Sequence, residues 1–434
     1  DRTLSFLGYD VNHVMNITDI GHLSDDGDDG EDKMLKTARE RSQSVLEIAQ
    51  FYTDAFFNDI DRLNIKRPTI TCKATDHVQD MIELIKKIEN NGHTYMAGGN
   101  LYFDVSTFKD YGKLALLNLD DLKAGARIDV DQNKRNPFDF VLWFTKSKFE
   151  NQALVWDSPW GRGYPGWHIE CSAMSMKYLG EQFDIHTGGI DHIPIHHTNE
   201  IAQSEGATGK KWVNYWLHNE FLVIAKDKNK GSEESDGKMS KSSGNFLTLQ
   251  TLIDKGYDPL DYRFFLLGAH YRSQVAFSWE AMEGAKNARK ALNQRISRIL
   301  NENDVDTQIV LSSQGDQILR SFTEAIEDDL ASPRCLSELQ VMLKNPELAD
   351  NEKVSLIRTM DKVLGLRLID SALALKQQKT EAGEVNADIE ALIQQRTDAK
   401  KQKNYALADK IRSELQEKGI ILEDTPQGTI WKKA

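Results

Sequence analysis

The spacing of apolar residues changes near residue 278, and this change constrains the fold more than any other feature of the chain. From about residue 278 to residue 379, apolar side chains recur with a period of about 3.6 and glycine is scarce, which is typical of a helical bundle. Before this point, strand-like apolar runs at 11–17, 100–105, 182–186 and 215–225 alternate with helical stretches. The sequence therefore predicts an α/β domain followed by an α-helical bundle.

Three shorter segments interrupt this plan. Residues 96–150 are more mixed in character, which indicates an insertion within the α/β domain. A joint containing Gly and Glu is predicted at 381–386, followed by one more helix pair and a hairpin about the turn Pro426-Gln427-Gly428. The acidic loop at 24–32 lacks the alternating carboxylates of a calcium loop, so a solvated loop is expected there.

Composition excludes several classes of protein. No run of about eighteen apolar residues is present, so no segment is expected to span a membrane. Three cysteines, far apart, argue against a disulfide scaffold and for a reducing compartment, the cytoplasm. The net charge of −13 argues against a protein that simply coats nucleic acid. The segment from 396 to 434 is nevertheless net positive, with nine Lys or Arg against six Asp or Glu, a weak hint of a polyanionic partner.

One cluster of residues has the composition of a metal site. If Pro194 opens a helix, His196 and Glu200 are four residues apart and project from the same face. Imidazole and carboxylate at that spacing can share a zinc ion, and Cys171 upstream offers a thiolate. The alternative is a helical surface pair, with Cys171 as a small buried apolar residue. The spacing leaves both interpretations open.

A second group of residues suits phosphate. Lys238-Met239-Ser240-Lys241-Ser242 places two ammonium groups among hydroxyls, and such groups can neutralise the charge that builds up as pyrophosphate leaves. An ordinary surface turn has the same composition. Gly189 and Asp191, which follow a strand, would let a ribose approach the backbone and accept its hydroxyls. Glycine turns and basic loops are common, so an ordinary turn remains the alternative for both groups.

Taken together, these motifs resemble the cysteinyl-tRNA synthetase family of class I aminoacyl-tRNA synthetases along nearly the whole chain. The pair Gly-Trp-His-Ile-Glu-Cys and His-His-x-Asn-Glu is close to diagnostic of that family. The matching stretches occur in the family's order: Asn-Ile-Thr-Asp (16–19), Tyr-Phe-Asp-Val (102–105), Asn-Leu-Asp-Asp-Leu-Lys-Ala-Gly-Ala-Arg (118–127), Asp-Phe-Val-Leu-Trp (139–143), Ser-Pro-Trp-Gly-Arg-Gly-Tyr-Pro-Gly-Trp-His-Ile-Glu-Cys (158–171), His-His-Thr-Asn-Glu (196–200), Lys-Met-Ser-Lys-Ser (238–242), His-Tyr-Arg-Ser (270–273) and Leu-Glu-Asp-Thr-Pro-Gln-Gly-Thr (422–429).

The resemblance implies a zinc site. In the family one zinc ion per chain is held by two cysteines, a histidine and a glutamate, and it binds the substrate cysteine as thiolate. Cys171, His196 and Glu200 match three of these ligands. The fourth belongs to an N-terminal Cys-Gly-Pro-Thr stretch, which this sequence does not contain, and neither does it contain the His-Ile-Gly-His-type signature. We expect both to lie upstream of Asp1, so that the sequence as given is not expected to be catalytically competent.

The resemblance also assigns roles to other residues. Thr18 and Trp167 match the cysteine pocket, and the alternative for Trp167 is a large core aromatic. His168, Gly189 and Asp191 match positions that meet ATP or the adenylate, and Lys238 and Lys241 match the catalytic loop. The positions that read the tRNA anticodon in the family correspond to Lys400, Tyr405, Asp409 and Asp424. For Tyr405, the alternative is a role in helix packing.

The implied reaction has two steps. Cysteine attacks the α-phosphorus of ATP, bound with Mg²⁺, and the resulting cysteinyl-adenylate passes its acyl group to tRNA(Cys). L-cysteine, ATP and tRNA(Cys) are therefore the expected partners, with no membrane, and the chain is expected to be a monomer. Two alternatives remain: a relative that joins cysteine to an amino sugar, which lacks the tRNA-reading tail, and a non-catalytic tRNA-binding paralogue.

The implied fold is a Rossmann-like class I catalytic domain with an inserted domain, an α-helical bundle and a small C-terminal α+β anticodon-binding domain. Its expected parts are the first half of the catalytic domain (1–95), the inserted connective domain (96–150), the second half with the zinc site (151–225), the signature loop and stem-contact region (226–277), the helical bundle (278–385) and the anticodon-binding domain (386–434).

Overall fold

The structure, a computed structural model, describes residues 1–20, 44–116, 132–146, 154–225, 247–301, 309–425 and 428–433. The chain forms two compact units, each described by itself below. Unit 1 comprises Asp1–Asn287, Ser321–Glu338 and Lys362–Leu366, and unit 2 comprises Ala288–Arg320, Leu339–Asp361 and Arg367–Ala434. None of the helices in the described residues combines the length and the hydropathy that crossing a bilayer requires.

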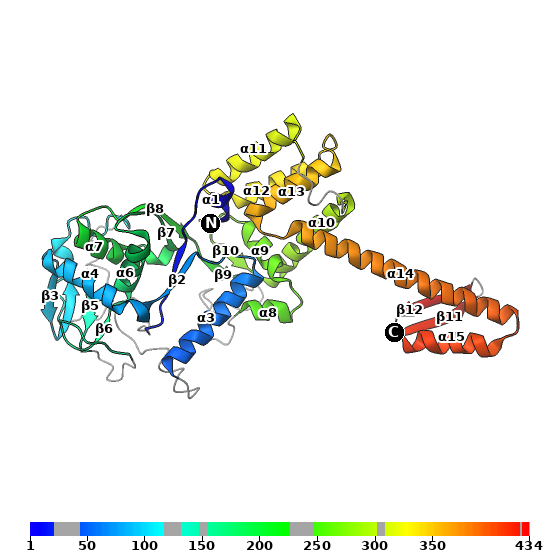
Figure 1. The fold of residues 1–434 in the computed structure, drawn as a ribbon, viewed down its shortest axis with the longest axis horizontal. Helices are drawn as coiled ribbons and strands as arrows, with labels where there is room; N and C mark the ends of the chain where they lie inside the picture. Colours follow the sequence, from blue (N-terminus) through cyan, green and yellow to red (C-terminus); the bar gives the residue numbers. More distant parts are fainter. Residues whose placement is uncertain are drawn as a thin grey trace. The chain divides into compact units, whose positions relative to one another are not determined.

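Unit 1 is built on parallel strand pairs covered by helices (Figure 1). Strand β1 (Val14–Ile17) pairs with β2 (Ile70–Lys73), and β7 (Phe183–Gly189) pairs with β8 (Val213–Asn219). A helix lies between the strands of each pair, α3 (Val45–Arg62) in the first and α7 (His196–Thr208) in the second, as expected for the long connection that parallel strands need. The predicted α/β domain is thus confirmed, as are the strands predicted near 11–17 and 182–186.

The core of unit 1 gathers around helix α4 (Val78–Asn90). Met81, Ile85 and Ile88 recur at helical spacing on one face and are fully buried. Helix α4 packs against both α6 (Trp167–Leu179) and α7, and α6 also packs against β1. Helices α6 and α7 are therefore held by the same core, which fixes the side chains that they carry.

An antiparallel sheet lies between the two halves of this α/β fold in the sequence. It has the order β3 (Thr94–Ala97), β4 (Asn100–Phe103), β5 (Phe140–Phe144) and β6 (Tyr164–Pro165). All five residues of β5 are buried, which explains its unbroken apolar sequence. The sheet overlaps the insertion predicted at 96–150 but extends beyond both of its ends.

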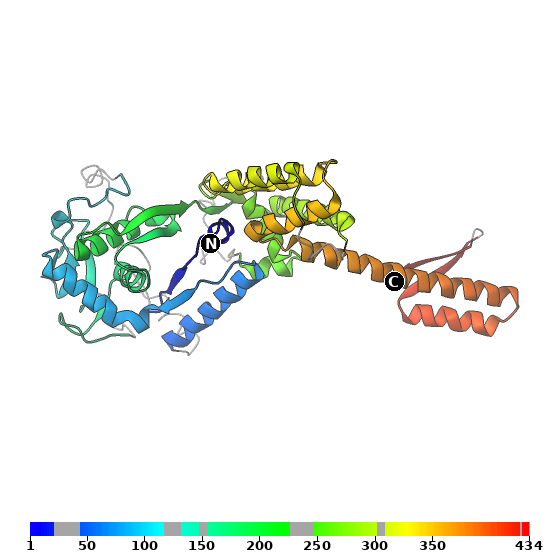
Figure 2. The same ribbon diagram turned by 45° about the horizontal axis from the view of Figure 1, so that its top comes forward.

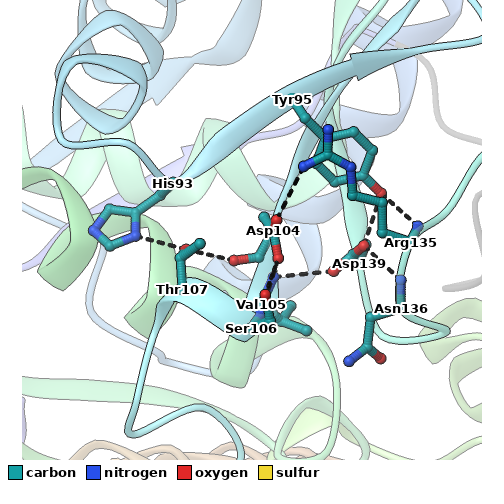
Figure 3. A network of polar contacts seen from close by, with 9 residues as sticks. All are labelled: His93, Tyr95, Asp104, Val105, Ser106, Thr107, Arg135, Asn136 and Asp139. Atoms are coloured by element: carbon teal, nitrogen blue, oxygen red, sulfur yellow. Dashed lines mark hydrogen bonds and ion pairs between the residues drawn. The ribbon is translucent and has the colours of Figure 1, made fainter.

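A buried carboxylate fastens this sheet to the segment that enters β5 (Figure 3). Asp139 is 1 % exposed, and it accepts hydrogen bonds from Tyr95 Oη (2.7 Å), Asn136 N (2.8 Å) and Val105 N (3.0 Å). The guanidinium of Arg135 stacks on the Tyr95 ring, 4.0 Å from its centroid. Because Asp139 is followed directly by β5, these bonds fix where that strand begins.

A second polar cluster, centred on Asp329, holds the His-Tyr-Arg-Ser motif (270–273) in place through hydrogen bonds and an ion pair. Asp329 accepts a hydrogen bond from Tyr271 Oη (2.7 Å) and forms an ion pair with Arg272, while its carbonyl oxygen lies 2.8 Å from His270 Nε2. Asp329 has a φ of +50°, in the left-handed region that residues other than glycine rarely adopt. Tyr271 O in turn accepts from Glu220 N (2.9 Å), which connects the motif to the link between β8 and β9 (Leu222–Ile224).

Replacing Asp329 with Ala is expected to lower the free energy of unfolding by about 2 kcal/mol, because Tyr271 and Arg272 lose their carboxylate partner and alanine disfavours the left-handed backbone. Asp328→Ala is the matched control, since Asp328 is 68 % exposed and forms an ion pair with Arg334 at the surface. The control is expected to change stability by less than about 0.5 kcal/mol. Urea unfolding followed by circular dichroism measures both changes, and equal effects would argue against the role of Asp329.

Of the remaining helices, three lie before residue 278 and four lie within the predicted helical region. They are α1 (Arg2–Phe6), α8 (Leu249–Asp254), α9 (Pro259–Leu267), α10 (Trp279–Ile299), α11 (Ser313–Glu327), α12 (Ser332–Lys344) and α13 (Asp350–Leu364). From 279 to 364 the described elements are all helices, so the prediction from apolar spacing is confirmed.

In unit 2 one long helix leads into a small C-terminal module (Figures 1 and 2). Helix α14 (Leu368–Lys401) runs without interruption through residues 381–386, so the joint predicted there is wrong. A single glycine inside a helix costs only about 1 kcal/mol, too little to break it when the helical pattern continues on both sides. Helix α15 (Tyr405–Glu417) and the antiparallel hairpin of β11 (Ile420–Thr425) and β12 (Gly428–Lys433) follow, which confirms the predicted hairpin.

Candidate functional site

Two helix starts bring the candidate metal ligands together. Helix α6 begins directly after Gly166, whose N–H donates to Leu142 O in β5 (3.0 Å). A Cβ at Gly166 would lie 2.2 Å from the carbonyl oxygen of Val141, so glycine is what allows the helix to begin so close to the strand. Helix α7 begins at His196, soon after Pro194.

Cys171 on α6 and His196 and Glu200 on α7 point at one another. Their sulfur, nitrogen and oxygen donor atoms all lie within 4.8 Å of one another, and His196 Nε2 is 2.6 Å from Glu200 Oε1. Asn16 on β1 donates its amide to Cys171 Sγ (3.2 Å). The three ligands suggested by the sequence are therefore neighbours in space, although Cys171 is separated from the other two by more than twenty residues.

The carboxylate of Glu200 is the centre of this group. It is fully buried, and its second oxygen, Oε2, lies 3.1 Å from Nε2 of His186 on β7. Burial by itself raises the pKa of Glu200, but the imidazoles of His186 and His196 outweigh burial and hold that pKa well below the usual carboxyl range. Glu200 is therefore an anion at neutral pH, as a metal ligand must be.

The thiol of Cys171 has the opposite character. Burial, together with the negative charges of Glu200 and Glu170, raises the pKa of Cys171 well above the usual thiol value. A divalent cation among the three donors would reverse this, because coordination deprotonates a thiol outright. Sulfur, imidazole nitrogen and carboxylate oxygen are the donor types that zinc prefers, so the residues present fit a zinc ion.

A second group of donors shares Glu200. His186, His197 and Glu200 also place their donor atoms within 4.8 Å of one another. Burial, the largest effect, lowers the pKa of His197 to about 3, so this imidazole is neutral, and its Nδ1 lies 2.8 Å from His218 Nε2. The sequence analysis missed His186 and His218. The only signal available was that both lie in strand-like segments before and after the His-His doublet.

Aromatic rings close around the donors. The Trp167 ring lies 4.3 Å from the His196 ring and 5.8 Å from the His168 ring, centroid to centroid. His168 is 3 % exposed, and its Nδ1 is 2.8 Å from Nδ1 of His196. This contact uses one ring nitrogen of His196, and Nε2, the nitrogen near Glu200, is the one that faces the other donors.

The other predicted residues of unit 1 lie around this centre or outside the described residues. Thr18 is half-buried and follows β1 directly, two residues after Asn16. Gly189 ends β7, and the Asp191 carboxylate lies over it, since a Cβ at Gly189 would be 2.3 Å from Asp191 Oδ1. Lys238 and Lys241 are among residues 226–246, which the structure does not describe. The acidic loop at 24–32 also lies outside the described residues.

In unit 2, two of the four candidate anticodon residues form an ion pair. Lys400 Nζ donates to Asp424 Oδ2 (2.8 Å), and Arg396, one turn earlier on α14, grips both oxygens of the same carboxylate (2.8 and 2.9 Å). Thr429 Oγ1 on β12 also donates to Asp424 (2.7 Å). The sequence analysis missed Arg396, which is almost completely buried.

The other two candidate anticodon residues lie on helix α15. Tyr405 is its first residue and is 62 % exposed. Asp409, one turn later, is exposed as well, and its charge acts on Arg396. The structure thus places the four candidates in one C-terminal module, with Lys400 and Asp424 in direct contact.

The stability of this module is expected to depend on pH. Hydrogen bonds from Arg396, then Lys400 and Thr429, hold the pKa of Asp424 well below its usual range. Because this pKa is lower in the folded chain than in the unfolded chain, the ionised carboxylate stabilises the fold at pH values above the unfolded-state pKa of about 4. The stabilisation is lost progressively as the pH falls below about 4. We expect the Asp424→Asn variant to have a lower Tm than the native chain at pH 7. The difference between the two Tm values is expected to be smaller at pH 3. A constant difference between pH 7 and pH 3 would contradict this.

Comparison with protein families gives two matches. The family described as tRNA synthetases class I (C) catalytic domain matches residues 1–287. The family described as cysteinyl-tRNA ligase anticodon binding domain matches residues 382–431. Together these two matches include every candidate residue discussed above.

Curated relatives match the chain over its full length. The cysteine–tRNA ligase of Treponema denticola is 61 % identical over 450 residues, which cover 100 % of this chain and 89 % of the relative. The cysteine–tRNA ligase of Treponema pallidum is 45 % identical over 467 residues, covering 100 % of this chain and 90 % of the relative. Among solved structures, methionyl-tRNA synthetase of Mycobacterium tuberculosis has a TM-score of 0.52 at 17 % identity, with 86 % of each chain covered, a likeness of fold alone.

Proposed function

Because the chain belongs to the cysteine–tRNA ligase family of class I tRNA synthetases, we propose that it activates L-cysteine with ATP and transfers the cysteinyl group to tRNA(Cys). The observation that carries this proposal is the cluster of half-buried Cys171 with buried His196 and Glu200, whose donors lie within 4.8 Å of one another. A site with these donors suits a substrate whose side chain is itself a soft ligand.

The three residues of this cluster would hold one zinc ion. When bound, zinc accepts the substrate thiolate and favours sulfur over the oxygen of serine, a distinction that an apolar pocket makes poorly. The remaining work belongs to the protein: His168 and His186 orient His196 and Glu200 through contacts of 2.8 and 3.1 Å. Trp167 covers the His196 ring and helps to exclude water from it, and we assign Thr18 as well to binding the substrate cysteine.

Activation joins the cysteine carboxylate to the α-phosphorus of Mg²⁺-bound ATP, and pyrophosphate leaves. We assign Lys238 and Lys241 to neutralising the charge on the leaving phosphates, and His168, Gly189 and Asp191 to binding the nucleotide. Gly189 permits close approach of the ribose, and the Asp191 carboxylate beside it can accept ribose hydroxyls. The terminal ribose hydroxyl of tRNA(Cys) then attacks the adenylate carbonyl, and AMP leaves.

The C-terminal module would bind the anticodon. Tyr405 offers an exposed ring on which a base can stack, and the exposed Lys400 and Asp409 offer polar groups for base edges, with Asp424 paired to Lys400. We further propose that the protein acts as a monomer. The three free cysteines suit a reducing compartment such as the cytoplasm.

The test is cysteine-dependent exchange of pyrophosphate into ATP, measured on the protein made from its complete reading frame. Serine and the other amino acids are assayed in parallel. We expect exchange with cysteine alone and its loss on zinc chelation, followed by charging of tRNA(Cys). Exchange with no amino acid, in a preparation that contains zinc, would instead favour a non-catalytic tRNA-binding paralogue.

A further inference from the structure

We propose that Arg396 is a positioning residue of the anticodon site. It holds the Asp424 carboxylate in one orientation, and Asp424 in turn orients the Lys400 ammonium, which donates a hydrogen bond to one anticodon base. This inference rests on the proposed function of the C-terminal module. It differs from the roles suggested by the sequence, where Asp424 itself reads a base and Arg396 has no role.

The first argument is the saturation of Asp424. Arg396 and Thr429 both donate to Oδ1, at 2.8 and 2.7 Å, while Arg396 and Lys400 both donate to Oδ2, at 2.9 and 2.8 Å. A carboxylate has about four acceptor positions, so four donors leave none for a base N–H. Asp424 is therefore suited to hold other side chains in place, not to accept from a nucleotide.

The second argument is the geometry of the fork. Arg396 is 3 % exposed, and its planar guanidinium meets the carboxylate with two parallel bonds. This arrangement fixes direction as well as distance, which a lysine ammonium cannot do. It also links α14 to both strands of the hairpin, because Asp424 on β11 is directly opposite Thr429 on β12. Asp424 is consequently held in one orientation.

The third argument concerns Lys400. It is four residues after Arg396 on the same face of α14, and its ammonium donates one hydrogen bond to the anchored Asp424. An ammonium has three N–H donors, and the Lys400 side chain is 41 % exposed. The hydrogen bond to Asp424 therefore orients the Lys400 ammonium. Its other N–H groups can donate to acceptor atoms on a base edge, such as N7 and O6 of guanine. Tyr405 in the same module offers a stacking face.

The experiment uses the full-length protein and four tRNA(Cys) transcripts, one native and three with a single anticodon base changed. Arg396→Lys keeps the positive charge and removes the fork. We expect kcat/KM for charging of the native transcript to fall roughly tenfold. At a single anticodon position, the ratio of kcat/KM for the native base to kcat/KM for the changed base is expected to approach one. The preferences at the other two positions remain.

Arg412→Lys is the matched control, because Arg412 is an exposed arginine on α15 of the same module. It is expected to leave all four charging rates unchanged. If Arg396→Lys fails to fold, as judged by circular dichroism, Thr429→Val removes one donor to Asp424 with little change in volume. The same loss of preference at the same position is then expected, with a smaller effect.

Two results would overturn the proposal. One is an equal fall for all four transcripts, which indicates a purely structural role for Arg396. The other is an unchanged preference at every position in both variants. Pyrophosphate exchange involves no tRNA and is measured on every protein, so failure of the native protein to activate cysteine would refute the proposed function separately.

Discussion

Cys171→Ser is expected to remove most of the bound zinc and to abolish cysteine activation. The thiol donor lies within 4.8 Å of the donors of His196 and Glu200, and serine offers only a neutral hydroxyl, a poor zinc ligand. Because loss of residues that merely support a ligand costs about 10- to 100-fold in metal affinity, loss of a ligand itself is expected to cost about 100-fold or more. Zinc content by atomic absorption and cysteine-dependent pyrophosphate exchange measure the two effects.

Cys335→Ala is the matched control for this prediction. Cys335 is fully buried on α12 and is not among the candidate metal donors of the described residues. Its replacement removes a thiol of the same chain and is expected to leave the zinc content unchanged, with a modest loss of stability. If Cys171→Ser retains a full complement of zinc, Cys171 is not a ligand and the assignment of the site fails.

Lys241→Ala is expected to slow adenylate formation by about 10²- to 10³-fold while zinc content stays unchanged. The ammonium is assigned to the charge that develops on the leaving pyrophosphate, and removal of one such stabilising donor typically has this effect on kcat. Single-turnover formation of cysteinyl-adenylate measures the rate. The affinity for cysteine, measured by isothermal titration without ATP, is expected to be retained.

Lys228→Ala is the control for the loop, since Lys228 belongs to the same lysine-rich stretch but lies outside the Lys-Met-Ser-Lys-Ser motif. It is expected to leave the rate of adenylate formation within about twofold of the native value, because only the lysines of the motif are assigned to the leaving phosphates. If the Lys241→Ala variant loses zinc in proportion to its loss of adenylate-formation rate, Lys241 supports folding and does not act in the chemical step.

Much of this protein followed from the sequence. Apolar spacing predicted the helical region after residue 278, and an α/β domain in which strands alternate with helices was expected before it, as the structure confirms. The i,i+4 spacing of His196 and Glu200 placed both on one helix face, because that relation depends only on helical geometry. The prediction of a joint at 381–386 failed because a single glycine perturbs a helix locally and weakly, while helix α14 continues past it.

The contacts that aim the functional side chains came only from the tertiary structure. His186 reaches Glu200 from a different element, and Asn16 reaches Cys171 from the first strand. Neither contact has a signal in sequence spacing, because side chains on separate elements meet according to how those elements pack. The sequence thus determined which residues are available and which faces they share. Packing alone decided that Glu200 is held as an anion and that Arg396 grips Asp424.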